Sequence, residues 1–189
     1  MSYFIKMLVF CAISLSMTTS PSVANSDKIR KAGFLIDENR HQEALSLYEE
    51  ILKEGTISDD RQKSQIFNNM GYCYYTLNQA EKALLYYKRA LGLNQSYPIC
   101  LNNCAVIYMN RKKYQEAFLY LKRAYELDKE NIKVVFNLFV VFYHLDKKDE
   151  ARFYLSEAFR IDERYTEDRF KNKNIGYRDI ERLKKIIHK

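Results

Sequence analysis

Residues 114–131, YQEAFLYLKRAYELDKEN, determine the fold, because similar stretches occur 34 residues before and after them. The preceding stretch is AEKALLYYKRALGLNQSY (80–97) and the following one is KDEARFYLSEAFRIDERY (148–165). Seven sets of matched residues recur at this step: Ala83, Ala117 and Ala151; Ala90, Ala124 and Ala158; Asn69, Asn103 and Asn137; Tyr86, Tyr120 and Tyr154; and apolar sets that begin at Tyr74, Tyr87 and Leu93. A period of this length indicates stacked supersecondary units.

Each block carries two apolar stripes at helical spacing with a short turn between them. The stripes of one block are Phe67, Met70, Gly71 and Tyr74, and then Ala83, Tyr87, Ala90 and Leu91; residues 76–79 (TLNQ) separate them. Spacings of three and four residues predict one buried face per helix, so each block is two antiparallel helices. Gly71 is expected to face Ala83, where small residues let the helices approach closely. With 5 Gly and 2 Pro, the chain also has too few turn residues for an all-β domain.

This pattern resembles the tetratricopeptide repeat, a helix–turn–helix unit of 34 residues. The motif positions are occupied by Phe67, Met70, Gly71, Tyr74, Ala83, Tyr87 and Ala90; by Leu101, Cys104, Ala105, Tyr108, Ala117, Leu121 and Ala124; and by Val135, Leu138, Phe142, Ala151, Leu155 and Ala158. A weaker copy contains Ala32, Leu35, Ala44, Tyr48 and Ile51. The resemblance implies an all-α, right-handed solenoid of four repeats at 25–58, 64–97, 98–131 and 132–165, with residues 59–63 inserted after the first.

The departures from the motif predict local differences. Gln95, Lys129 and Glu163 stand where the family has proline, so the helix ends should be less sharply defined. Phe139 replaces the small residue of the close helix contact, so we expect the last hairpin to be splayed.

Residues 166–189 are predicted to close the stack with a capping helix near 177–188. Its apolar face consists of Tyr177, Ile180, Leu183 and Ile187. This segment has eight Lys and Arg against four acids, so it is also a basic tail on a nearly neutral body.

The first 24 residues predict an export signal. Lys6 precedes the apolar run 7–17 (MLVFCAISLSM), and Ser22 and Ala24 are small residues at the −3 and −1 positions of a cleavage site. The run is shorter than the roughly 20 residues that cross a bilayer, so an uncleaved anchor is the less favoured alternative. We expect cleavage after Ala24 and a periplasmic or secreted protein, and we do not favour membrane association.

The family resemblance also implies a binding site. In this family the first helix of each repeat lines a concave groove, and by position nine residues face it: Asn68, Asn69, Tyr72, Asn102, Asn103, Val106, Lys133, Asn137 and Val140. An Asn amide has one acceptor and two donors, so the Asn column is suited to pair with the backbone of an extended peptide. The alternative is that these amides join neighbouring helices. The Lys and Arg clamp with which some family members hold a C-terminal carboxylate is matched only by Asn103 and Lys133.

The sequence carries no recognisable catalytic, cofactor or metal motif. His41, His144 and His188 lie in separate segments without metal-ligand spacing to one another or to Cys. After signal cleavage three cysteines remain: Cys73, Cys100 and Cys104. Cys73 and Cys104 are expected to be neighbours, so a disulfide between them is one interpretation. We favour the other, in which all three are small side chains of the core. The basic charge lies in the tail and not along the repeats, which argues against nucleic acid as a partner.

Together these patterns predict an exported, non-enzymatic scaffold or adaptor that holds an extended segment of a protein or peptide partner in its groove. The alternative is a structural subunit of a cell-envelope complex, docked through its convex face and its basic tail.

Overall fold

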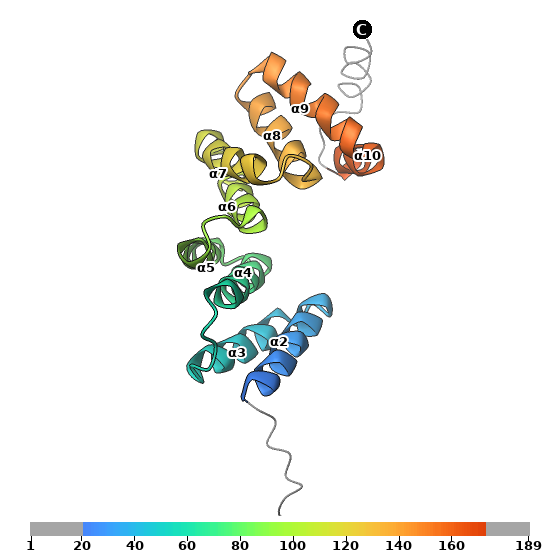
Figure 1. Ribbon diagram of the computed structural model, residues 1–189. Helices are drawn as coiled ribbons and strands as arrows, with labels where there is room; N and C mark the ends of the chain where they lie inside the picture. Colours follow the sequence, from blue (N-terminus) through green and yellow to red (C-terminus); the bar gives the residue numbers. More distant parts are fainter. Residues whose placement is uncertain (1–20, 173–189) are drawn as a thin grey trace, which may run out of the picture. The chain divides into compact units, whose positions relative to one another are not determined.

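The computed structural model describes residues 21–172, which form nine α-helices and no β-strand (Figure 1). The helices are α2 (Pro21–Asp37), α3 (His41–Lys53), α4 (Asp60–Thr76), α5 (Ala80–Leu93), α6 (Pro98–Asn110), α7 (Tyr114–Leu127), α8 (Ile132–His144), α9 (Lys148–Ile161) and α10 (Glu163–Asn172). The predicted all-α fold of helical hairpins is therefore confirmed. The chain divides between Asp59 and Asp60 into two compact units.

The first unit contains the α2–α3 hairpin, where the sequence shows the weaker copy of the repeat. Its core includes all five predicted motif residues: Ala32, Leu35, Ala44, Tyr48 and Ile51. At the surface of this hairpin, Lys28 Nζ lies 2.7 Å from Glu50 Oε1 and also pairs with Glu54. Helix α2 begins at Pro21, so the predicted cleavage after Ala24 falls within its first turn. The next residue, Asn25, is buried, and its Nδ2 donates a hydrogen bond to Thr56 Oγ1.

In the second unit, three hairpins follow one another: α4–α5, α6–α7 and α8–α9 (Figure 1). Their turns are built alike, because Asn78, Lys112 and Asp146, spaced by 34 residues, all have positive φ near +57°. In the first of these turns the Gln79 N–H donates to the Tyr74 carbonyl at 2.8 Å, a hydrogen bond that satisfies the end of α4. The turn residues explain why each hairpin reverses at the same position of the repeat.

The helices of the α4–α5 hairpin approach each other closely at Gly71. A Cβ atom at Gly71 would lie 2.6 Å from Tyr87 Cδ1 and 3.2 Å from the Ala83 carbonyl oxygen, so only glycine fits beneath the Tyr87 ring. In the next hairpin the equivalent positions are Ala105 and Leu121, both fully buried. The larger first-helix residue is thus matched by a smaller second-helix residue, which keeps the packed volume similar.

The tyrosine column of the sequence also has a packing role. Within each hairpin, a ring of the first helix stacks on a ring of the second, and the ring centroids are 5.1–5.4 Å apart in the pairs Tyr74–Tyr86, Tyr108–Tyr120 and Phe142–Tyr154. Such offset aromatic pairs contribute about 0.5–1.5 kcal/mol beyond the area they bury.

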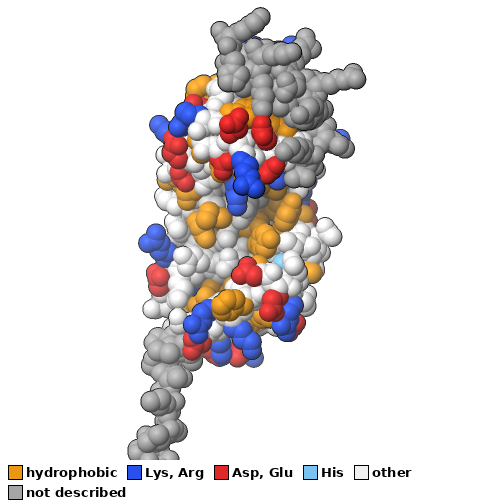
Figure 2. All heavy atoms as spheres, turned by 90° about the vertical axis from the view of Figure 1, so that its right-hand side faces the viewer, with side chains coloured by type: hydrophobic (Ala, Val, Ile, Leu, Met, Phe, Trp, Pro, Cys, Tyr) orange, Lys and Arg blue, Asp and Glu red, His pale blue; other side chains and the backbone are white. Residues whose placement is uncertain are grey.

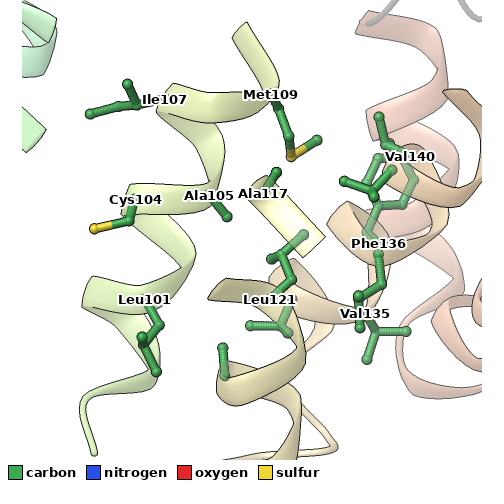
Figure 3. Close-up of a cluster of buried hydrophobic side chains, with 14 of the residues drawn as sticks. Leu101, Cys104, Ala105, Ile107, Met109, Ala117, Leu121, Val135, Phe136 and Val140 are labelled. Atoms are coloured by element: carbon green, nitrogen blue, oxygen red, sulfur yellow. The ribbon is translucent and has the colours of Figure 1, made fainter. Parts of the chain in front are cut away.

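Helix α6, the first helix of the middle hairpin of this unit, is buried on two sides. Figure 3 shows Ala105 and Met109 on the side of α6 that faces α7 and α8, whereas Cys104 and Ile107 point the other way. On that other side, Cys100 Sγ donates a hydrogen bond to the Tyr87 carbonyl of α5 at 3.3 Å. An inner helix with two buried sides is what a stack of hairpins requires, because no hairpin can cover both of its own faces.

Helix α10 covers the last hairpin. The centroid of the Phe170 ring lies 5.6 Å from that of Phe136 and 5.5 Å from that of Phe139. Thr166 Oγ1 donates a hydrogen bond to the Ala158 carbonyl at 3.0 Å. Phe139, which we expected to splay the last hairpin, is fully buried against this helix. The predicted capping helix at 177–188 lies outside the described residues. A cover at Glu163–Asn172, which starts inside the predicted fourth repeat, was not predicted from the sequence.

Candidate functional site

The first-helix face, formed by α4, α6 and α8 of the second unit, contains the nine residues assigned to the groove. Tyr72 (42% exposed) and Lys133 are exposed, and Asn69, Asn103 and Val106 are half-buried. The other four are buried: Asn68, Asn102, Asn137 and Val140. Figure 2 is turned toward the side on which α4 and α6 lie in Figure 1, and over these helices the exposed side chains are mostly uncharged, with hydrophobic ones among them. Five of the nine residues are therefore accessible to a ligand.

Asparagine amides connect successive first helices. Asn103 Nδ2 donates to Asn68 Oδ1 at 3.1 Å, which joins α6 to α4, and Asn137 Nδ2 donates to Asn102 Oδ1 at 2.8 Å, which joins α8 to α6. In both pairs the donor comes 35 residues after the acceptor, so the bond recurs with the repeat. These bonds give the asparagines a role in packing the hairpins together, since buried polar groups are costly without a partner. Contact of the same column with a peptide stays a prediction.

A small pocket opens on this face where α4, α5 and α6 meet. It has a volume of about 70 Å³ and is lined by Tyr72, Tyr75, Tyr87, Asn103 and Val106. Tyr75 is held in place by Asn110, whose Nδ2 donates to the Tyr75 hydroxyl at 2.8 Å. The pocket has room for one small aliphatic side chain, about twice the volume that a water molecule occupies. Its lining combines phenol rings with one amide, so it is suited to hold a peptide side chain and to bond the adjacent backbone.

The sequence reasoning found Tyr72, Asn103 and Val106 but missed Tyr75 and Tyr87 as pocket residues. Tyr87 was assigned only to the core, and it does lie there, at 2% exposure. Burial raises the pKa of its hydroxyl far above the ordinary value, so the side chain is neutral. For Tyr75, the only indication in the sequence was that it directly follows Tyr74, the last residue of the predicted apolar stripe.

The three described cysteines are free thiols in the core. Burial raises the pKa of Cys73 to about 11. The pKa of Cys100 is also raised, chiefly by its contact with Cys104 and secondly by burial. Thiols that resist ionisation are poor nucleophiles and poor metal ligands. Within residues 21–172, no group of three His, Cys, Asp or Glu side chains is placed to hold a metal ion. No helix of that part of the chain is both long and apolar enough to cross a membrane.

The stacked hairpins define the class of this protein as a helical-repeat interaction module. Residues 22–96 and 98–131 both match family profiles described as tetratricopeptide repeat, and the chain belongs to that family. A comparison with curated proteins gave no match.

Solved structures with the same fold include proteins that bind peptides. YrrB, described as a TPR protein with an unusual peptide-binding site, is 20% identical with a TM-score of 0.60, over 75% of this chain and 70% of YrrB. PilF of Pseudomonas aeruginosa is 19% identical with a TM-score of 0.67, over 84% of this chain and 69% of PilF. The first TPR domain of Spaghetti (RPAP3), bound to the HSP90 peptide SRMEEVD, is 17% identical with a TM-score of 0.56, over 70% of this chain and 99% of that domain. At these identities the likeness shows the fold alone.

Proposed function

We propose that this protein is a non-enzymatic scaffold that binds an extended segment of a partner protein on its first-helix face. The observation that carries the proposal is the pocket of Tyr72, Tyr75, Tyr87, Asn103 and Val106, which lies beside the exposed Tyr72 ring on a mostly uncharged surface. Protein binding is the role of the tetratricopeptide-repeat family, and two of the similar structures are described with peptides.

The accessible and the buried residues of the face have different roles in this proposal. Tyr72, Asn103 and Val106 contact the ligand, together with Asn69 and Lys133 on the same face. Asn68, Asn102 and Asn137 hold the helices at a constant spacing through their amide bonds, and Val140 packs in the core. A peptide read through one small pocket and backbone hydrogen bonds is recognised with little dependence on its sequence.

We also propose that the chain is exported and cut after Ala24, on the basis of Lys6, the apolar run 7–17 and the small residues Ser22 and Ala24. Mass spectrometry of the mature protein should then find Asn25 at its N-terminus. Abundant soluble protein that retains Met1 would contradict export.

A second candidate function, a structural subunit of a cell-envelope complex, is favoured by the other helices of the stack. The second helices expose an apolar row of Leu85, Leu119 and Phe153, which are 49%, 63% and 52% exposed and lie at equivalent repeat positions. Exposed rows of this kind on a soluble module mark contact surfaces. The basic tail of this candidate lies outside the described residues.

Peptide display tests the first-helix site. A library of random peptides is selected on the purified protein, and the enriched peptides are measured against Tyr72→Ser and Asn137→Ala. Tyr72→Ser should weaken binding about tenfold or more at unchanged stability, because an exposed aromatic anchor is lost. Asn137→Ala should instead lower the stability by about 1–2 kcal/mol, because the Asn102 acceptor loses its partner. If no enriched peptide loses affinity in Tyr72→Ser, the first-helix face is not the peptide site.

A further inference from the structure

The second-helix face of the stack, formed by α5, α7 and α9, contains a recess near its C-terminal end. This aromatic recess lies between α7 and α9, with the α8 residue Phe142 in its lining, and has a volume of about 560 Å³. Its rings are Phe118, Tyr125, Phe142, Phe153 and Tyr154. A volume of this size lies within the range of about 300–1,000 Å³ that is typical of ligand-binding pockets.

The five rings pack against one another, so the lining of the aromatic recess is held in place. Phe142 lies 5.2 Å from Phe118 and 5.3 Å from Tyr154, measured between ring centroids. Tyr154 in turn lies 5.5 Å from Tyr125 and 5.1 Å from Phe153. Phe153 is nevertheless 52% exposed. A large apolar ring therefore contacts the edge of a packed neighbour and is left half open to solvent, which is the arrangement of a binding anchor.

Phe142 and Tyr154 form the stacked pair that recurs in every hairpin of the second unit, but the stacking of repeats does not require the other three rings. The residues 34 positions before Phe118, Tyr125 and Phe153 are Leu84, Leu91 and Leu119. In the preceding hairpin, Leu84 and Leu91 are buried, so leucine fills the first two positions adequately. The aromatic side chains are thus a property of the last junction and not of the repeat.

Charges of opposite sign stand on the two sides of the aromatic recess. Lys122 and Glu126 line it from α7, Lys129 lines it from two residues beyond the end of that helix, and Asp149 and Glu150 line it from α9. Within the described residues, Lys122, Lys129 and Asp149 form no ion pair, and Glu150 has only a 3.8 Å contact with Lys147. Charged side chains around an apolar recess favour a ligand that carries the complementary charges.

We propose that the aromatic recess is a second protein-binding site, which takes a segment with bulky apolar side chains flanked by one acidic and one basic residue. The apolar side chains enter between Phe118, Tyr125 and Phe153. The acidic residue faces Lys122 and Lys129, and the basic residue faces Asp149 and Glu150. This site is independent of the first-helix face, because different residues line it.

The geometry favours a polypeptide over a membrane surface. A recess between two helices is filled by protruding side chains, whereas the surface of a bilayer would leave it empty. The acids Asp149 and Glu150, together with Glu126, would also be repelled by anionic lipid headgroups.

The test uses random peptides of about 16 residues displayed as a library and selected on the purified protein, long enough for a helix or a strand to cross the recess. Phe153→Asp should weaken by about tenfold or more the binding of those enriched peptides that Tyr72→Ser leaves unaffected. The matched control is Leu85→Asp, which changes an equally exposed residue at the same repeat position of α5, away from the recess. It should leave binding unchanged, and both variants should retain the helical spectrum of the parent.

A charge exchange tests the orientation of the ligand. For a peptide that depends on Phe153, changing its acidic residue to Lys should weaken binding to the parent protein and restore it to the Lys122→Glu variant. The proposal is overturned if no enriched peptide depends on Phe153, if Leu85→Asp causes an equal loss, or if the exchange restores nothing. Binding of phosphatidylglycerol vesicles that is lost in Phe153→Asp, without any Phe153-dependent peptide, would assign the surface to membrane contact and also overturn it.

Discussion

The substitution Gly71→Ala tests whether the close approach of α4 and α5 is a constraint of this sequence. Two effects oppose each other. Alanine is favoured over glycine inside a helix by about 1 kcal/mol. The new Cβ, however, would lie 2.6 Å from both Cδ1 and Cε1 of Tyr87. Carbon atoms pack at about 3.5–4.0 Å, so the ring must move by about 1 Å. Tyr87 is only 2% exposed and has no open space to enter. Overpacking of this kind costs about 1–3 kcal/mol, so we expect a net loss of up to about 2 kcal/mol.

A control and a rescue make this prediction specific. Gly92 in α5 has nothing within 4 Å of an added Cβ, so Gly92→Ala should stabilise the protein by about 0.5–1 kcal/mol. The rescue is Gly71→Ala with Tyr87→Leu, which reproduces the Ala105 and Leu121 pair of the next hairpin. The double variant should be more stable than the sum of its two single changes predicts, by about 1–3 kcal/mol.

The assay is urea unfolding followed by circular dichroism, with midpoints and slopes compared across the four proteins and the parent. If Gly71→Ala is as stabilising as Gly92→Ala, the Tyr87 ring moves freely and the packing argument fails. Additivity of the double variant would refute the proposed coupling of the two positions.

Two further predictions follow from the turns and the buried thiols. Lys112 has a φ of +57°, a conformation that asparagine tolerates better than lysine does. Lys112→Asn should therefore raise the urea midpoint by an amount equivalent to about 0.3–1 kcal/mol, and Asn78→Lys should lower it. A lower midpoint for Lys112→Asn would contradict this. Burial raises the pKa of Cys73 to about 11, so its thiolate is scarce at about pH 8 and increases only as the pH approaches 11. Mass spectrometry after iodoacetamide treatment should therefore find Cys73 unmodified in the folded protein and modified in urea. Rapid labelling of the folded protein would show that the thiol is accessible.

The hairpins were predictable because they depend on a local pattern that recurs. Ala83, Tyr87 and Ala90 define a buried face by their spacing alone, and the structure buries all three. Even the weaker first copy could be found in this way, since Ala44 and Tyr48 keep the same spacing with less support from their neighbours. Periodicity predicts which side of a helix is buried wherever the neighbouring hairpin covers that side.

Helix α10 was not predictable from periodicity, and the predicted capping helix at 177–188 lies outside the described residues. The sequence has a clear apolar face at 177–188, whereas α10 presents Thr166 and Phe170, which are a single helical turn apart. Which segment covers α8 and α9 depends on the shape of the surface that Phe136 and Phe139 leave open. That surface exists only after the last hairpin has formed, so a local pattern contains no information about it.

The candidate site divides in the same way. Residues that face the groove could be assigned from the repeat, and Tyr72, Asn103 and Val106 do meet at one pocket. The amide bonds between Asn68 and Asn103 and between Asn102 and Asn137 were only one of two interpretations, because the sequence does not give the register of one hairpin on the next. The aromatic recess was missed for a related reason. Phe118 and Tyr125 occupy apolar positions that are buried in the preceding hairpin, and nothing in their spacing distinguishes a ring that fills the core from one that lines an open recess.

An exact repeat places the same chemistry on every hairpin, so a site that occurs only once must arise where the repeats differ. On the first-helix face the position of Tyr72 is followed by Val106 and then Val140, which is only 5% exposed, so the accessible surface changes from a phenol to an aliphatic side chain along the stack. On the second-helix face the change runs the other way, because the Leu119 position of α7 becomes Phe153 in α9 beside the recess. The pocket of the first-helix face is lined from α4, α5 and α6 and the recess mainly from α7, α8 and α9, so the two sites involve no common residue. A ligand on one face leaves the contacts of the other unchanged, and we expect the two binding free energies to be additive unless the hairpins shift against each other.

The affinity of a Tyr72-dependent peptide, measured with and without a saturating Phe153-dependent peptide, tests this additivity. Equal affinities indicate a scaffold that joins two partners. A difference would show that the stack transmits strain between its faces.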